Sequence, residues 1–139
     1  MFTIEQIKEA HSRVKSGADF PNFIQDLIQL GVNGFETYSE DGHSTYFGHL
    51  EFTLESGPLH KSMKVSDQSD KTQFQQDLKA NQDGKTDFIT FCRDCAKSGI
   101  EKWVMDMSNM SCTYFDKAGD PVLAETIPIP REKSSTYYP

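Results

Sequence analysis

Long hydrophobic runs are missing from this chain, and cysteine is scarce. No stretch approaches the ~18 apolar residues that a membrane-spanning helix needs. The segment from Met1 to Lys15 carries five charged side chains and has no continuous apolar core of the kind that marks a signal peptide. Three cysteines give an odd count without the spacing of a secreted disulfide framework. We therefore expect a cytoplasmic protein with no membrane partner.

Positive charge is also in short supply. The chain has 14 Lys and Arg against 21 Asp and Glu, so its formal net charge is −7. An acidic domain is repelled by phosphate backbones and by anionic lipid. The basic residues are scattered and form no stripe along the sequence. Nucleic acid is therefore not an expected partner.

Recognisable catalytic and metal-binding motifs are absent as well. The sequence has no GxSxG, P-loop or Rossmann glycine pattern. Cys92 and Cys95 have the CxxC spacing, but a redox pair would place its first cysteine at a helix N-terminus, and here the helical pattern already begins at Phe88. Zinc would need two further ligands, for which only Cys112 and a histidine are on hand. We predict two buried, reduced cysteines, no metal, no cofactor and no assigned catalytic residue.

What the chain does contain is the pattern of an α+β domain with many aromatic residues, among them ten Phe, five Tyr and one Trp. Thr3 to Gln6 reads as a capping box that opens a helix. Asp19, Pro21 and Gly31 delimit a second helix. Further helices are expected over 70–81 and from Asp87 to Gly99. Strands are expected over 32–40, 44–55, 100–107, 111–116 and 122–127, with a two-residue hairpin turn at Asp41-Gly42.

Residues 18–47 and 86–115 align with each other without gaps. Identical residues include Phe20/Phe88, Phe23/Phe91 and Tyr46/Tyr114, and Phe35 aligns with Trp103. Two unrelated segments that each form a capped helix followed by a hairpin could converge on part of this pattern. The shared Thr-Tyr-Phe triplet, however, is not required by a capped helix or by a hairpin. We predict two helix-helix-hairpin repeats that form one antiparallel sheet with helices mainly on one face. A groove along the axis between them is a natural ligand site.

The hairpin pairing predicts which side chains share a face of the sheet. With Thr37 opposite Tyr46, the helix-covered face receives Phe35, Tyr46, Leu50, Trp103 and Tyr114. The other face is half polar and is our candidate ligand or partner face. Its candidate residues are Tyr38, Phe47, His49, Glu51, Lys102, Val104, Asp106 and Phe115. His49 beside Glu51 is the best acid–base candidate, although a solvated histidine is the commoner outcome on a strand.

Length and composition predict a single α+β domain over 1–130, followed by a flexible C-terminal tail over 131–139. Pro128 and Pro130 are expected to end the sheet, because proline cannot donate to a strand ladder.

Several short stretches of the second half resemble the C-terminal half of the YbcV-like family. They are Lys102-Trp103, Met105-Asp106, Cys112-Thr-Tyr-Phe-Asp116 and Ile127-Pro128. GVNGFETYSEDGHSTYFG in the first half is similar to a Gly-Val, Asp-Gly and Tyr stretch of that family. This is a bacterial domain family of unknown function, often labelled "phage envelope protein". The resemblance runs from about Ile4 to Pro130 and implies a bacterial, phage-related protein, but it carries over no catalytic residue.

Two functions fit these observations. The first is a non-enzymatic interaction or adaptor module of phage or mobile-element origin, which leaves open a homodimer or an unidentified protein partner. The alternative is a small-ligand-binding protein or enzyme that uses the groove between the repeats, with polar groups such as His49, Glu51, Tyr38, Lys102 and Asp106. A deep pocket would favour the second function and a flat aromatic contact face the first.

Overall fold

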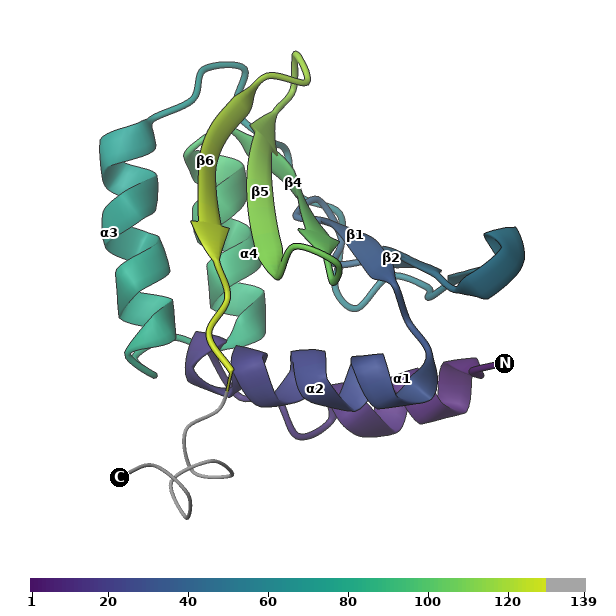
Figure 1. Cartoon of the computed structure of the whole chain (residues 1–139). Coiled ribbons are helices and arrows are strands. Elements are labelled where there is room, and N and C mark those ends of the chain that lie inside the picture. Colours follow the sequence, from purple (N-terminus) through teal and green to yellow (C-terminus); the bar gives the residue numbers. More distant parts are fainter. Residues whose placement is uncertain (130–139) are drawn as a thin grey trace, which may run out of the picture.

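The computed structural model describes residues 1–129, and the expected tail over 131–139 lies outside this range. Over residues 1–129 the chain forms a mixed α+β structure with four α-helices, two short 3₁₀ turns and a six-stranded antiparallel sheet (Figure 1). The helical elements are α1 (Ile4–His11), η1 (Gly17–Asp19), α2 (Phe20–Leu30), η2 (His49–Glu51), α3 (Lys71–Gln82) and α4 (Phe88–Lys97). The strands are β1 (Gly34–Tyr38), β2 (Ser44–Phe47), β3 (Thr53–Glu55), β4 (Ile100–Asp106), β5 (Ser111–Asp116) and β6 (Pro121–Thr126).

The ends of the first two helices follow from their capping residues. The Thr3 hydroxyl accepts a hydrogen bond from the Gln6 backbone N–H, and the Gln6 side chain accepts one from the Thr3 N–H, so the predicted capping box is present. Gly31 ends α2 with a φ of 95°, a conformation that costs glycine little. Asp19 differs from expectation: its side chain makes no cap bond to α2 and instead accepts from the Lys15 N–H.

The second helix pair is capped by aspartates. Asp70 accepts from the Gln73 N–H at 3.0 Å, and Asp87 accepts from the Thr90 N–H at 2.8 Å. These bonds satisfy backbone donors that the first helical turn leaves open. Gly99 follows α4 with a φ of 77°, and a Cβ at this position would collide with the Gln68 carbonyl. Both the backbone conformation and the close approach therefore require glycine here.

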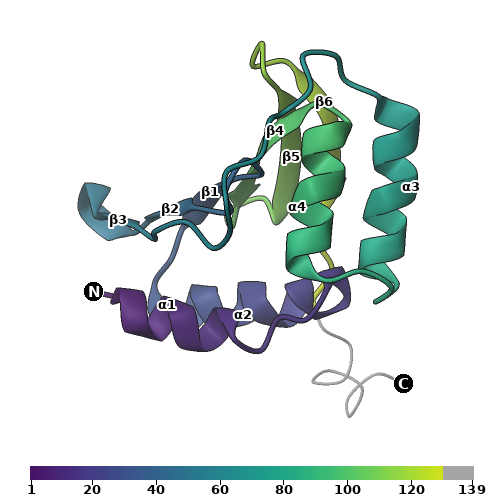
Figure 2. The same cartoon turned by 180° about the vertical axis from the view of Figure 1, so that it is seen from behind.

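The sheet has the strand order β3-β2-β1-β4-β5-β6, and every neighbouring pair is antiparallel. Strands β1 and β4 meet at its centre. Each side of this junction is a three-stranded meander preceded in the chain by two helices. Helix α4 lies across the sheet with α3 beside it, while α1 and α2 run roughly at right angles to them below the sheet (Figures 1 and 2).

The helix-covered face of the sheet is aromatic. Phe35, Tyr46, Trp103 and Tyr114 are each at most 4% exposed. The Phe35 ring lies 6.1 Å from the Phe23 ring of α2, and other rings on this face meet α4 in the same way. Alternation along β1, β2, β4 and β5 thus places these four side chains on one face as predicted. We call this face the inner face and the opposite one the outer face.

The predicted hairpin turn at Asp41-Gly42 is wrong in length. The observed register pairs Phe35 with Tyr46 and Thr37 with Ser44, and five residues, 39–43, connect β1 and β2. The Asp41 carboxylate accepts from the His43 N–H at 3.0 Å, which stabilises this longer loop. Because the register differs by two residues, each side chain keeps its predicted face.

The expected strand over 44–55 is also interrupted. Strand β2 ends at Phe47, and β3 begins at Thr53. Between them Leu50 and Glu51 both have positive φ, at 56° and 63°, and the Phe52 N–H donates to the His49 carbonyl at 3.2 Å. This is a tight hairpin turn of the left-handed class. Leu50 is 82% exposed at its tip, so its predicted place on the helix-covered face is wrong.

Candidate functional site

Part of the predicted ligand or partner face forms a cluster on the outer face of the sheet. Lys102 Nζ lies 3.0 Å from Glu36 Oε1 and 5.7 Å from the ring centroids of both Tyr38 and Phe115. The hydrogen bond to Glu36 raises the pKa of Lys102. Tyr38 stacks on His43 at 4.5 Å. Strands β1, β4 and β5 thus bring Tyr38, Lys102 and Phe115 together.

The other predicted residues of this face serve local structure or lie apart from the cluster. The Asp106 carboxylate accepts from the Ser108 N–H at 2.8 Å and from the Asn109 amide at 2.9 Å, which closes the β4–β5 turn. Val104 is half-buried within β4, and Phe47 ends β2. His49 and Glu51 lie in η2 rather than in a strand. The expected pairing of His49 with Glu51 on a strand face is therefore absent.

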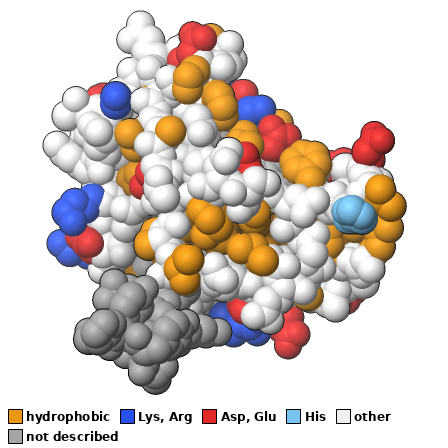
Figure 3. All heavy atoms as spheres, in the orientation of Figure 1, with side chains coloured by type: hydrophobic (Ala, Val, Ile, Leu, Met, Phe, Trp, Pro, Cys, Tyr) orange, Lys and Arg blue, Asp and Glu red, His pale blue; other side chains and the backbone are white. Residues whose placement is uncertain are grey.

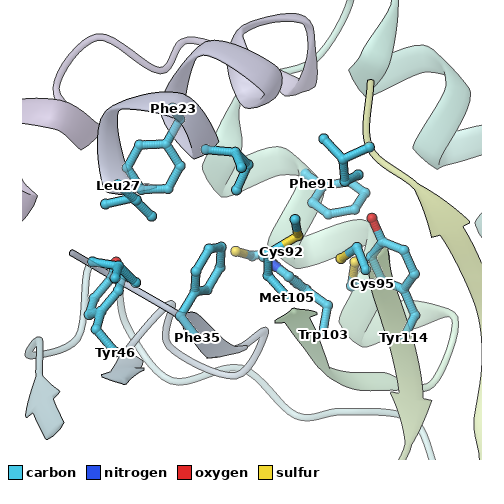
Figure 4. Close-up of a cluster of buried hydrophobic side chains, with 14 of the residues drawn as sticks. Phe23, Leu27, Phe35, Tyr46, Phe91, Cys92, Cys95, Trp103, Met105 and Tyr114 are labelled. Atoms are coloured by element: carbon cyan, nitrogen blue, oxygen red, sulfur yellow. The ribbon is translucent and has the colours of Figure 1, made fainter. Parts of the chain in front are cut away.

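A cavity of about 240 Å³ lies between the inner face of the sheet and the helices, and none of the eight predicted residues lines it. Phe23 of α2 faces Phe35 and Tyr46 across the space, while Phe91 of α4 approaches Trp103 and Tyr114 (Figure 4). Hydrophobic side chains also reach the surface near the centre of the view in Figure 3, above the helices at its lower edge. The cavity thus lies within the aromatic core.

Eight Phe, Tyr and Trp side chains line this cavity, and each half of the chain supplies four of them. They are Phe20, Phe23, Phe35 and Tyr46 from the first half, and Phe88, Phe91, Trp103 and Tyr114 from the second. These are four of the residue pairs that align between segments 18–47 and 86–115. Four aligned pairs of aromatic residues therefore surround one shared space.

A few polar groups interrupt the apolar wall. The Tyr114 hydroxyl donates to Glu125 Oε1 at 3.1 Å, and Gln82 Nε2 donates to both oxygens of the same carboxylate. The Thr37 and Ser44 hydroxyls are hydrogen-bonded to each other at 2.6 Å. Such a combination, an apolar lining with few convergent polar groups, is typical of small-molecule sites.

Two further polar side chains lie at the edge of the cavity. The His11 ring packs edge-on against Phe23 and Phe88, and its burial lowers its pKa. Asn81 is buried and donates to the Thr86 carbonyl at 2.8 Å. A Cβ on Gly17 would overlap the Asn81 side chain, so glycine is needed there for close packing. His11 is therefore neutral near pH 7, and Asn81 ties the end of α3 to the loop that follows it.

The three cysteines lie in the core as free thiols, in agreement with the prediction that Cys92 and Cys95 are buried and reduced. Burial raises the pKa of Cys92 and of Cys112 to about 12 and raises that of Cys95 as well. A thiol with so high a pKa is a poor nucleophile at neutral pH. Within residues 1–129, no cluster of three or more His, Cys, Asp and Glu side chains is arranged to bind a metal ion.

Sequence reasoning missed the polar lining of the cavity because it treated the inner face as core alone. Glu125 could have been found. It lies two residues after Leu123 and two before Ile127, which both pack on the core, so period-two alternation places a carboxylate on an apolar face. Gln82 and His11 carry no comparable signal, since both lie on helices with mixed polar faces.

No helix within residues 1–129 combines the length and apolar character needed to span a bilayer. Uncharacterized proteins of Mycobacterium bovis and of two strains of Mycobacterium tuberculosis are 29% identical to the chain over 97 residues. That alignment covers 69% of this chain and 59% of each relative, so the match spans about three fifths of the mycobacterial proteins. The model of a family described as "Protein of unknown function (DUF1398)" matches residues 8–126, and the chain belongs to this family.

Proposed function

We propose that this protein binds a small, ring-containing molecule in the aromatic cavity between the sheet and the helices. One observation carries the proposal: a space of about 240 Å³ is lined by eight aromatic side chains and a few polar groups. An engineered cavity of about 150 Å³ in another protein is large enough for benzene. The space here is sufficient for one ring and a short substituent.

The cost of such a space supports a binding role. Protein interiors are close-packed, and voids larger than a water molecule are few. Side chains that line an unfilled space lose dispersion contacts with neighbouring atoms. Domains have only ~5–15 kcal/mol of stability in total. A space of this size is retained most readily when a ligand occupies it, as in other proteins that trade stability for function.

The internal repeat supplies a reason for the position of the cavity. We infer that the two segments arose by duplication and that their matched aromatic residues, including Phe35/Trp103 and Tyr46/Tyr114, were retained to enclose one ligand. The antiparallel pairing of β1 with β4 and the matching element order on its two sides support this inference. A duplicated helix–hairpin unit would bring equivalent side chains to its axis from both directions.

The proposal is tested with neutral single-ring compounds. Toluene and 2-phenylethanol should raise the melting temperature, because a ligand that binds only the native state stabilises it. Both should also change the emission of Trp103, which lines the cavity. The proposal is contradicted if neither compound raises the melting temperature and neither changes the emission of Trp103.

Filling the space provides the matched comparison. Val14→Phe and Ala18→Leu place extra atoms at the cavity wall and should abolish both effects. Val104→Phe makes the same chemical change as the first variant but on the outer face, and should leave binding intact. Circular dichroism checks that each variant is folded. Equal binding by the wild type and by a folded Val14→Phe or Ala18→Leu variant would place the ligand elsewhere.

A second proposal is that the outer face acts as an adaptor surface, or as the contact of a homodimer. The grouping of Tyr38, Lys102 and Phe115 on a face opposite the helices supports it. Against it, Phe47 and Phe115 are half-buried, and the large exposed apolar side chains of residues 1–129 lie elsewhere. A phage or mobile-element origin rests on the family resemblance alone. If this second proposal holds, light scattering should find association that a combined Phe47→Ser and Phe115→Ser variant loses.

A further inference from the structure

Within residues 1–129, the cavity wall carries one formal charge, and it is negative. Among the described residues that line the space, Glu125 is the single acid, and none is Lys or Arg. His11 adds no positive charge near neutral pH, because its burial lowers its pKa. Among residues 1–129, an anionic ligand would therefore meet a carboxylate and no compensating cation.

The Glu125 carboxylate is held in place by neutral donors. The Tyr114 hydroxyl contacts Oε1 at 3.1 Å, and Gln82 Nε2 lies 3.1 Å from Oε1 and 3.0 Å from Oε2. An ionised carboxylate has about four lone-pair sites, so capacity for a further donor remains. Tyr114 is buried and Glu125 half-buried, which fixes the group where the aromatic lining meets β6. A side chain positioned in this way is pre-organised for a ligand.

Five carboxylates of residues 1–129 meet a cation of the protein, and Glu125 is among those that do not. Glu36 is paired with Lys102, Asp26 with Arg13 and Asp67 with Lys117. No Lys, Arg or His nitrogen of residues 1–129 lies within 4.0 Å of Glu125. A half-buried carboxylate with only neutral partners is a site at which an external cation gains the most binding free energy.

The aromatic lining favours the same ligand charge. The faces of Phe, Tyr and Trp rings are electrostatically negative and attract a cation within about 6 Å of the ring centroid. The rings of Trp103 and Tyr114 lie 6.2 Å apart, and Tyr114 touches Glu125. A cationic group beside the carboxylate would therefore also lie near aromatic rings.

We propose that the ligand of this cavity is an amine, with a protonated nitrogen at Glu125 and an apolar body among the aromatic rings. This inference rests on the proposed function, because it names the chemical class of the molecule that the cavity binds. It assigns Glu125 as the residue that determines ligand charge, with Tyr114 and Gln82 as its positioning residues.

Three probes of similar size and different charge test the inference on the full chain. They are 2-phenylethylamine, which is a cation at neutral pH, 2-phenylethanol, which is neutral, and 3-phenylpropionate, which is an anion. Titration followed by Trp103 emission and calorimetry should show the amine binding about tenfold more tightly than the alcohol, as a charge-assisted hydrogen bond would give. The anion should bind more weakly than the alcohol.

Two variants assign the charge preference to one residue. Glu125→Gln keeps an acceptor for the Tyr114 hydroxyl and should reduce the amine-to-alcohol ratio to about one, with alcohol affinity little changed. Glu55→Gln removes the same charge from an exposed position of β3, at the opposite edge of the sheet, and should leave the ratio unchanged. A Glu125→Gln variant that fails to fold is replaced by Gln82→Ala, which should lower the ratio in part.

The outcomes separate this inference from the proposed function. If the alcohol or the anion binds as tightly as the amine, the cavity binds ligands but Glu125 does not select a cation, and the inference is wrong. The same holds if Glu125→Gln retains the preference, or if Glu55→Gln loses it. If none of the three probes binds, both the inference and the proposed function fail.

Discussion

Replacing Trp103 by alanine tests the assignment of the inner face most directly. Trp103 is 4% exposed, and its ring lies 5.3 Å from Phe91, 6.4 Å from Phe88 and 6.2 Å from Tyr114. Loss of a buried tryptophan side chain costs ~3–5 kcal/mol, since transfer energy is lost and the remaining space is larger. For a chain of this length we expect the melting temperature to fall by roughly 10–20 °C.

The assay is urea unfolding followed by circular dichroism, because the variant has no tryptophan. Trp103→Phe is the control: it keeps an aromatic ring and reproduces the residue at the aligned position, Phe35, so its cost should be far smaller. Wild-type emission should be blue-shifted and resist acrylamide quenching. A change in unfolding free energy below about 1 kcal/mol for Trp103→Ala, together with emission like that of indole in water, would refute the assignment of faces.

Three further predictions concern other parts of the structure. All three cysteines should resist thiol reagents in the native protein and react in denaturant, and fast native labelling would contradict their burial. The hydrogen bonds from Thr90 lower the pKa of Asp87. The stability that Asp87 contributes should therefore be complete above the usual aspartate pKa of about 4 and should disappear as the pH falls through the lowered pKa. An Asp87→Asn variant should still cap α4 but should lack this pH dependence in thermal melts. In the β2–β3 turn, Leu50→Asn with Glu51→Gly should raise the unfolding free energy by ~1–3 kcal/mol, because these residues suit positive φ, and an unchanged urea midpoint would show that the turn is not strained.

Local rules were sufficient to predict most elements from the sequence. The capping box at Thr3 and the stop at Gly31 act within a few residues, so their patterns identify the helix ends directly. Period-two alternation placed the buried aromatic residues on one face for the same reason. The turn at Leu50 could not be predicted, because a leucine with positive φ is unfavourable locally and is stabilised only by the surrounding strands.

The candidate site was harder to predict because it depends on distant contacts. Alternation shows that a side chain points inward but not whether the interior is filled there. The cavity wall draws residues from α1, α2, α3, α4 and the sheet, and no local sequence pattern fixes how these elements meet. The partners of Glu125 come from β5 and α3, more than ten residues away in the chain. Its neutral environment therefore could not be predicted from the sequence either.

The strand order has a consequence for covalent connectivity. Each three-stranded meander is built from neighbouring chain segments, and one strand pairing, β1 with β4, joins the two. The irregular connection between β3 and α3 is anchored to the first half as far as Met63, whose N–H donates to the Glu40 carbonyl. From Ser66, whose N–H donates to the Ala96 carbonyl, it is anchored to the second half. A break in the chain between these residues would sever no strand pairing, so two separately produced fragments retain all the contacts needed to reassemble the sheet around its central pair.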